Sequence, residues 1–168
     1  SSAHTLTFAT VGQVPVGGKI VAVLPAASAL GSPQAAWAAV SSASLSVSPS
    51  GPSGSASLSG STLTLTLGGS TAVPQGQTVA FTVSAVRTPS SVVSSKTTGT
   101  LATQDSASKS IDSATGLRTD AIVAGTLGGA KTFAAATKTP GFSSAHTLTF
   151  AAVGQVPVGG KIVAVLPA

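Results

Sequence analysis

The chain has 168 residues, a formal net charge of +5 at pH 7, and only 7% charged residues. It contains no Cys, Met, Tyr, Asn or Glu, which excludes a disulfide framework, a thiolate metal site and an N-glycosylation sequon. Because 42% of its residues are hydrophobic, the chain should fold, and its length suits one sizeable core rather than two full domains.

The clearest secondary-structure signal is the alternation of apolar residues with Thr or Ser, which is typical of half-buried β-strands. It occurs at residues 4–8, 61–67 and 78–86. Residues 20–24 are apolar on both faces, which predicts a central strand or a strand covered by a neighbouring copy. Residues two apart share a sheet face, so the predicted core consists of Leu6, Phe8, Ile20, Ala22, Leu24, Leu65, Leu67, Val79, Phe81 and Val83.

The segments between and after these strands carry weaker signals. Residues 27–40 include the Ala-rich sequence PQAAWAAV and offer one short helix at most. Residues 41–60 are rich in Ser, Gly and Pro, which predicts a long exposed loop or an irregular edge strand around Leu45 and Val47. Further strands are predicted at residues 97–103, 117–127 and 130–137. The last two are expected to be joined by a turn at Gly128-Gly129.

A faint internal repeat aligns Val14 with Val73, an offset of 59 residues. The same offset aligns residues 5–8 (TLTF) with residues 64–67 (TLTL). Two similar strand-loop-strand modules therefore make up much of the fold. A duplicated module of this kind can supply two sheets that face each other.

The strongest feature is a near-identical copy of the first 26 residues. Residues 143–168 repeat residues 1–26 with one difference, Ala152 in place of Thr10. The offset of 142 residues, from position 1 to position 143, is too long for a solenoid unit of roughly 20 to 50 residues. It fits one independently folding bead of a tandem array. The sequence therefore indicates one full repeat followed by the opening of the next.

This duplication predicts three segments: an opening strand module at residues 1–26, the body of a β-sandwich at 27–142, and the start of the next repeat at 143–168. Two arrangements are open. In one, residues 143–168 complete the bead of 27–142 while residues 1–26 complete a preceding bead, so that neighbours share strands. In the other, residues 1–26 fold into their own bead. Either contact is head-to-tail and propagates into an open filament.

Strand addition satisfies an open sheet edge with main-chain hydrogen bonds and makes the joint part of a core. The apolar residues of the two copies are therefore the candidate residues for assembly between repeats. They are Leu6, Phe8, Ile20, Val21 and Val23 in the first copy, and Leu148, Phe150, Ile162, Val163 and Val165 in the second.

The hydroxyl-rich composition points to modification by O-linked glycans, since Ser and Thr are the acceptors that remain without Asn. The Ser/Pro/Gly segment at residues 41–60 resembles an O-glycosylated stretch. The alternative is an unmodified flexible loop. The candidate acceptors are Ser46, Ser48, Ser50, Ser53 and Ser55.

The residue types that carry catalysis or bind metals are scarce. The acids are Asp105, Asp112 and Asp120, and the imidazoles, His4 and His146, are the same position in two copies. No GxSxG elbow and no calcium-loop spacing occurs, so we expect no enzymatic activity, no metal site and no cofactor. Asp112 is expected to cap a turn.

The charge and hydropathy patterns also bear on partners. The eight basic residues are spread singly along the chain, whereas nucleic-acid-binding proteins concentrate them in a stripe, so we expect no nucleic acid partner. No apolar run approaches the roughly 18 to 20 residues of a membrane-spanning helix, so we expect no membrane insertion.

The pattern xTLTF...VPxGGKIVAVLP resembles the tandem β-sandwich repeats of very large secreted surface and fibre proteins of microbes and algae. The resemblance covers nearly the whole chain, and its motifs have low specificity. It implies an extracellular, often glycosylated filament that assembles head-to-tail, similar to strand complementation in pili. It carries over no functional residue.

We therefore expect an all-β protein with an immunoglobulin-like β-sandwich, whose terminal strands are shared with or continued into the neighbouring repeat. The expected function is that of a structural subunit of an extracellular fibril, with other copies of itself as partner. The alternative is a spacer or ligand-binding repeat of a cell-surface adhesin. A polysaccharide-active enzyme module is disfavoured because it commonly needs a pair of acids and the chain has no Glu.

Overall fold

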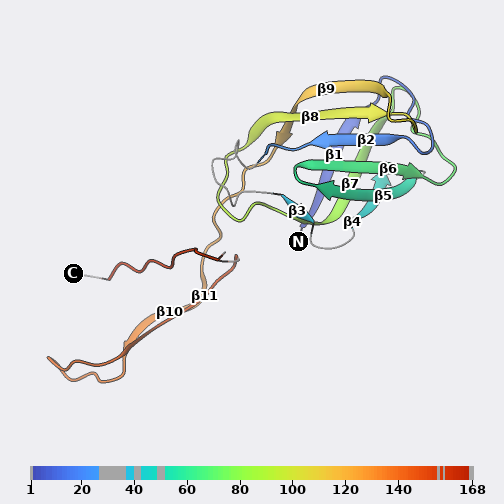
Figure 1. The fold of residues 1–168 in the computed structure, drawn as a ribbon. Helices are drawn as coiled ribbons and strands as arrows, with labels where there is room; N and C mark the ends of the chain where they lie inside the picture. Colours follow the sequence, from blue (N-terminus) through green and yellow to red (C-terminus); the bar gives the residue numbers. More distant parts are fainter. Residues whose placement is uncertain are drawn as a thin grey trace. The chain divides into compact units, whose positions relative to one another are not determined.

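The structure is a computed structural model, and it describes residues 2–26, 37–39, 43–48, 52–154, 156 and 158–166. These residues form β-strands, turns and loops without any helix (Figure 1), so the prediction of an all-β fold is confirmed. No helix long and apolar enough to span a membrane occurs among them. The chain divides into two compact units, Ser1–Val123 (unit 1) and Ala124–Ala168 (unit 2).

Unit 1 has nine strands in its described residues (Figure 1). The hydrogen-bonded order is β1-β7-β4-β5-β6-β2-β8-β9, and β3 pairs with β7 off this path. All pairs are antiparallel. The strands are β1 (Ser2–Ala9), β2 (Lys19–Val23), β3 (Ala38–Ala39), β4 (Ala43–Ser48), β5 (Ser53–Ser59), β6 (Thr62–Gly68), β7 (Thr78–Arg87), β8 (Lys96–Gln104) and β9 (Ser110–Thr119).

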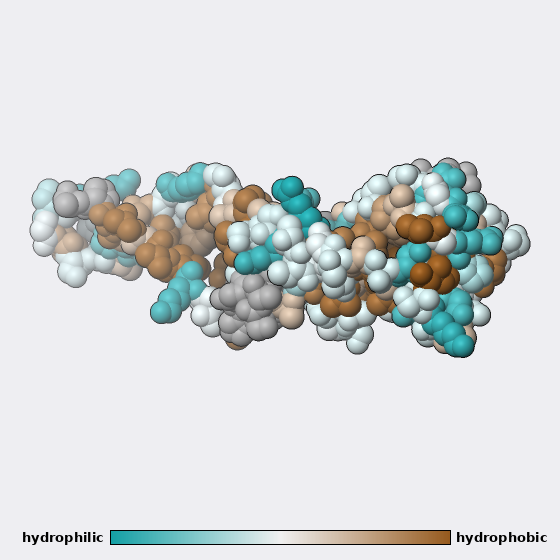
Figure 2. All heavy atoms as spheres, turned by 90° about the horizontal axis from the view of Figure 1, so that it is seen from above, coloured by the Kyte–Doolittle hydropathy of each residue, from teal (hydrophilic) through white to brown (hydrophobic). Residues whose placement is uncertain are grey.

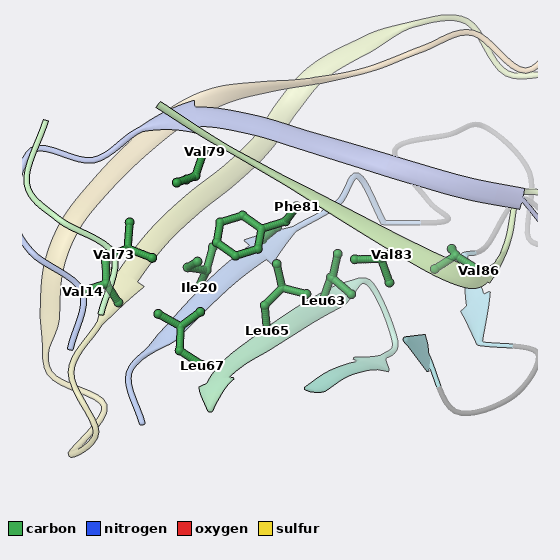
Figure 3. Close-up of a cluster of buried hydrophobic side chains, with 11 residues drawn as sticks. Val14, Ile20, Leu63, Leu65, Leu67, Val73, Val79, Phe81, Val83 and Val86 are labelled. Atoms are coloured by element: carbon green, nitrogen blue, oxygen red, sulfur yellow. The ribbon is translucent and has the colours of Figure 1, made fainter. Parts of the chain in front are cut away.

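The strands of unit 1 form two facing layers because β4 pairs with β7 through one half and with β5 through the other. Figure 3 shows apolar side chains from β7 on one side of the core and from β2 and β6 on the other. The result is a β-sandwich-like arrangement. The buried cluster contains Val14, Ile20, Ala22, Leu63, Leu65, Leu67, Val73, Val79, Phe81, Val83 and Val86.

Most of the alternation-based predictions are confirmed. The strands expected at residues 4–8, 61–67 and 78–86 are β1, β6 and β7, and residues 20–23 form a central strand between β6 and β8. Seven of the ten predicted core residues are buried. The other three, Leu6, Phe8 and Leu24, are half-buried.

The segment predicted as a loop or irregular edge strand contains two strands. Leu45 and Val47 lie in β4, and β5 is a regular strand that pairs with β6 along its whole length. The long exposed loop is therefore wrong for residues 53–59, because Ala56 and Leu58 alternate with Ser and pack against the core. Gly60, with a positive φ of 57°, makes the tight β5–β6 turn possible.

The proposed helix falls largely outside the described residues, which in this region include Trp37 and β3. The strand expected at 97–103 is confirmed by β8. The strand expected at 117–127 is misplaced, because β9 runs from Ser110 to Thr119 and pairs with β8 across a turn closed by Asp105.

Unit 2 contains a separate two-stranded antiparallel sheet made of β10 (Gly128–Ala135) and β11 (His146–Ala151). β10 confirms the strand expected near 130–137. Gly128-Gly129 opens this strand and does not form the predicted turn, since β10 pairs with β11 rather than with β9. The turn of this hairpin includes Gly141, whose φ is +70°.

Candidate functional site

The first copy of the repeated sequence, residues 1–26, is integrated into unit 1. β1 pairs with β7, so that Leu6 lies opposite Phe81 and Phe8 lies opposite Val79. The rings of Phe8 and Phe81 stack with centroids 5.8 Å apart. Ile20, on β2, is fully buried between neighbours on β6 and β8. This copy therefore supplies one edge strand and one central strand of the bead.

The end of β1 is held by the hydroxyl of Thr10. This buried group donates a hydrogen bond of 2.7 Å to the Pro74 carbonyl oxygen and accepts one of 3.2 Å from the Gln77 N–H. The backbone N–H of Thr10 donates to the Gln77 carbonyl oxygen at 3.1 Å. Thr10 thus joins the first module to the loop before β7.

The loop after β1 is capped by the carboxylate of Asp112 on β9. It accepts hydrogen bonds from the N–H groups of Val11 (3.2 Å) and Gly12 (3.0 Å). The Thr103 hydroxyl donates to the same carboxylate at 3.1 Å. Asp112 therefore caps backbone N–H groups remote in sequence, and not the local turn that we expected.

The glycine that follows the VPV sequence has a left-handed backbone in both copies. Gly17 has a φ of 77° and its counterpart Gly159 in unit 2 has a φ of 79°. Gly76, which the internal offset aligns with Gly17, has a φ of 70°. Glycine adopts this left-handed region without a Cβ penalty, so glycine at this position favours a turn in each of the three places.

The second copy has a different environment although its sequence is nearly the same. Residues 146–151 form β11 and pair with β10, and residues 161–165 form no strand. Ile162 is 62% exposed whereas Ile20 is 0% exposed. Val156 is 49% exposed whereas Val14 is 0% exposed. Among the described residues of unit 2, no strands pair with residues 161–165 as β6 and β8 pair with β2 in unit 1.

The ten candidate assembly residues follow this division. In the first copy Ile20 is buried, Leu6, Phe8 and Val21 are half-buried, and Val23 is exposed. In the second copy Phe150 is half-buried, while Leu148, Ile162, Val163 and Val165 are exposed. Their role in assembly stays a prediction.

The face shown in Figure 2 is a mixture of pale, weakly polar residues with brown apolar and teal hydrophilic residues among them. Of the candidate glycan acceptors, Ser53 and Ser55 are exposed on β5. Ser46 and Ser48 lie in β4, and Ser50 lies outside the described residues.

His4 is a half-buried ionisable residue of unit 1. Burial lowers the pKa of His4 below its usual value of 6.5, and the His4 ring meets the Trp37 ring edge-on with centroids 5.7 Å apart. Across the described residues, no group of three or more His, Cys, Asp or Glu side chains is placed to hold a metal ion.

A cavity of about 380 Å³ lies in unit 1 beside the N-terminal half of β1. Its lining includes His4, Trp37, Arg118 and Asp120. The Trp37 Nε1 is buried, and no hydrogen-bond partner for it occurs in the described part of the chain. A cavity of this size suits a small ligand.

Comparisons with known proteins give no relative: no family model matches the sequence, and no curated protein or solved structure is significantly similar to it. Within each unit, the copy of residues 1–26 is the best-defined candidate site, and its role as a junction between repeats stays a prediction.

Sequence reasoning missed two parts of this junction. The pairing of β10 with β11 was not predicted, although residues 130–137 were expected to form a strand next to the copy. The burial of Val14 and Val73 was also missed. The signal was present in their alignment by the internal offset, since matched apolar residues in two loops are candidates for mutual contact.

Proposed function

We propose that this chain is a structural subunit of an extracellular filament built from head-to-tail tandem β-sandwich repeats. The observation that carries the proposal is that one sequence occurs twice, buried in a completed bead in one copy and exposed in the other. Ile20 and Ile162 are the clearest pair. The second copy is then the unfinished start of a bead that the following repeat completes.

Physical chemistry favours covering the apolar side chains that only the second copy exposes. Val156 and Ile162 are 49% and 62% exposed, whereas their counterparts Val14 and Ile20 are fully buried. Burying a Val or Ile side chain contributes about 1.5–3 kcal/mol. Because the two surfaces that meet are different, the contact repeats in one direction and forms a filament.

The finer architecture belongs to the same proposal. It comprises an immunoglobulin-like sandwich whose terminal strands continue into, or are shared with, the neighbouring repeat. In the single chain, β1 and β2 pair with strands of the same unit. This pairing supports the arrangement in which each copy of residues 1–26 closes the bead that follows it in sequence.

The extracellular location and O-linked glycans rest on composition and on the resemblance to secreted fibre repeats. The exposed hydroxyls of Ser53 and Ser55 on β5 support the assignment of glycan acceptors. Intact-mass measurement on native material tests this part of the proposal. An unmodified polypeptide mass would remove the glycans from the proposal and leave the filament in place.

An extended chain, in which residues 27–142 are repeated after Ala168, tests bead completion. In the present chain, Ile162→Ala should change the free energy of unfolding by less than about 0.5 kcal/mol, because the side chain is exposed. In the extended chain the same substitution should destabilise the second bead by about 2–5 kcal/mol. Val165→Ala is the matched control, because its counterpart Val23 is exposed in unit 1.

Equal, small effects of Ile162→Ala in both chains would overturn the proposal. Electron microscopy tests the filament itself. Chains with increasing numbers of repeats should lengthen by a constant increment, and native material should appear as uniform fibres. Dispersed single particles would contradict the filament.

The alternative function, a ligand-binding repeat of a cell-surface adhesin, is favoured by the cavity beside Trp37. Its mixed lining of aromatic and charged side chains is typical of small-molecule sites. NMR titration of the chain with a panel of soluble oligosaccharides tests it. Shifts that centre on Trp37 and disappear in Trp37→Ala would favour the adhesin, whereas no shifts would remove this alternative.

A further inference from the structure

The backbone of β1 bonds to β7 through its even-numbered residues. In an antiparallel strand the N–H and C=O of one residue point to one edge, and those of the next residue point to the other. Thr10 donates its N–H to Gln77 across this pair, and the register is continuous from His4 to Ala9. The N–H and C=O groups of Thr5 and Thr7 therefore point away from β7.

That outer edge of β1 is the end of the sheet, since β1 is the first strand in the hydrogen-bonded order of the described residues. An open edge of this kind accepts a further strand. A candidate for this further strand is found in unit 2, where β11, the copy of β1, pairs with β10.

In unit 2 the copy bonds to its partner through the opposite set of residues. Ala136 donates its N–H to the Ala145 carbonyl oxygen at 2.8 Å, and the register is continuous from His146 to Thr149. The odd-numbered residues Thr147 and Thr149 therefore point to β10. They are the counterparts of Thr5 and Thr7, so β10 pairs with the edge of β11 that corresponds to the open edge of β1.

From this complementarity we propose that β10 of each repeat remains paired with the first strand of the next repeat after that strand has joined its own bead. The inference deepens the proposed function and rests on it. The occupant of the open edge is residues 128–135 of the preceding repeat. The sheet then continues from β10 through the first strand to the β7 of the next bead.

The side chains at this edge fit the same arrangement. Phe133 lies directly opposite Leu148, and its ring stacks on the His146 ring with centroids 4.9 Å apart and an interplanar angle of 13°. The counterparts of these two residues, Leu6 and His4, pack against the core cluster and against Trp37 in unit 1. Phe133, which is 48% exposed, therefore lies on the core side and extends the core of the next bead.

Hydrogen exchange measured by NMR at single residues, with segmental labelling of residues 124–168, tests this proposal. It distinguishes a completed bead that keeps β10, a completed bead that has lost β10, and a bead that is not completed. In the present chain, the amides of Thr147 and Thr149 should be protected, and those of Leu148 and Phe150 should exchange rapidly. In the extended chain both sets should be protected, with Leu148 and Phe150 slowed by roughly a hundredfold or more, because core strands open only by near-global unfolding.

Two results would overturn the inference in different ways. If Leu148 and Phe150 become protected in the extended chain while Thr147 and Thr149 lose protection, the bead is completed but β10 has left it, so only this inference fails. If Leu148 and Phe150 stay unprotected, the bead is not completed and the proposed function fails with it.

A proline pair provides the matched variant test. Ala134 lies opposite Thr147, and its N–H points to the first strand, so Ala134→Pro removes a hydrogen bond of this ladder. The N–H of Ala135 points the other way, so Ala135→Pro is the control. In the extended chain, Ala134→Pro should weaken the pairing of β10 with the first strand and so lower the protection of Thr147 while Leu148 stays protected, whereas Ala135→Pro should leave both protected. Equal behaviour of the two variants would contradict the proposed pairing.

Discussion

Val14 and Val73 form a reciprocal backbone pair, in which each N–H donates to the carbonyl oxygen of the other at 2.9 Å and both side chains are fully buried. They occupy matching positions of the two internal modules. The flanking strands follow the same exchange, since β1 of the first module pairs with β7 of the second and β6 of the second pairs with β2 of the first. Neither module is closed without the other, and residues 143–168 contain only a first module.

The core between these modules should depend strongly on Phe81, which is fully buried and stacks on Phe8. Phe81→Ala removes this contact and leaves a cavity, which should lower the free energy of unfolding by about 3–5 kcal/mol. Val92→Ala, at an exposed site, is the control and should have little effect. Denaturant unfolding followed by circular dichroism measures both, and a loss below about 1 kcal/mol for Phe81→Ala would contradict this core assignment.

The single difference between the two copies, Thr10 against Ala152, should affect the free energy of unfolding. Thr10→Ala removes the buried hydroxyl that bonds to Pro74 and Gln77, so we expect a destabilisation of about 1–3 kcal/mol, typical of a buried group left without its partner. In the extended chain, Ala152→Thr should stabilise the second bead through the same contacts. Thermal unfolding of both variants tests this expectation, and an unchanged midpoint for Thr10→Ala would refute it.

Asp112 should stabilise unit 1 through the hydrogen bonds that its carboxylate accepts from the loop after β1. Asp112→Ala leaves the N–H groups of Val11 and Gly12 without this acceptor, and a loss of about 1–3 kcal/mol is expected. Asp120→Ala removes an equal charge at an exposed position and serves as control. Denaturant titration at pH 7 compares them, and equal effects would show that charge rather than the cap matters.

The lowered pKa of His4 predicts a dependence of stability on pH. As the pH falls below 6.5, the unfolded chain binds a proton at His4 before the folded chain does, so stability should decrease toward the folded-state pKa. Above 6.5 the residue is neutral in both states and contributes no pH dependence. His4→Phe should flatten the curve of unfolding midpoint against pH near 6.

His146→Phe, in unit 2, is the matched control and should leave the pH dependence of unit 1 unchanged. Midpoints measured every half unit across this range provide the comparison. A slope in His4→Phe as steep as in the unsubstituted chain would assign the dependence to another group.

The sequence predicted the strands whose pattern is regular and the core that this pattern implies, because alternation in β1, β6 and β7 reflects burial of one face. The prediction failed where the neighbouring strands, rather than the local pattern, decide whether a segment forms a strand. Residues 161–165 have the same sequence as β2, yet they form no strand, since β2 requires β6 and β8 on its two sides. The turn at Gly17 and Gly159 forms in both copies because it is local.

The duplication alone was enough to select the two copies of residues 1–26 as the candidate site, and their role in assembly stays a prediction. The opposite use of the two edges of β1 and β11 was not accessible to sequence reasoning, because hydrogen-bond direction depends on which strand lies alongside. The capping role of Asp112 was expected, but its partners were not, since the N–H groups of Val11 and Gly12 are remote along the chain.

The pairing of β1 with β7 has a consequence for biosynthesis. Residues 2–9 leave the ribosome before residues 78–87, and residues 143–151 emerge only after both. Domains fold as units during synthesis, beginning with the N-terminal one. We therefore expect β1 to pair with β7 before residues 143–151 have been synthesised, so that the later copy cannot take its place.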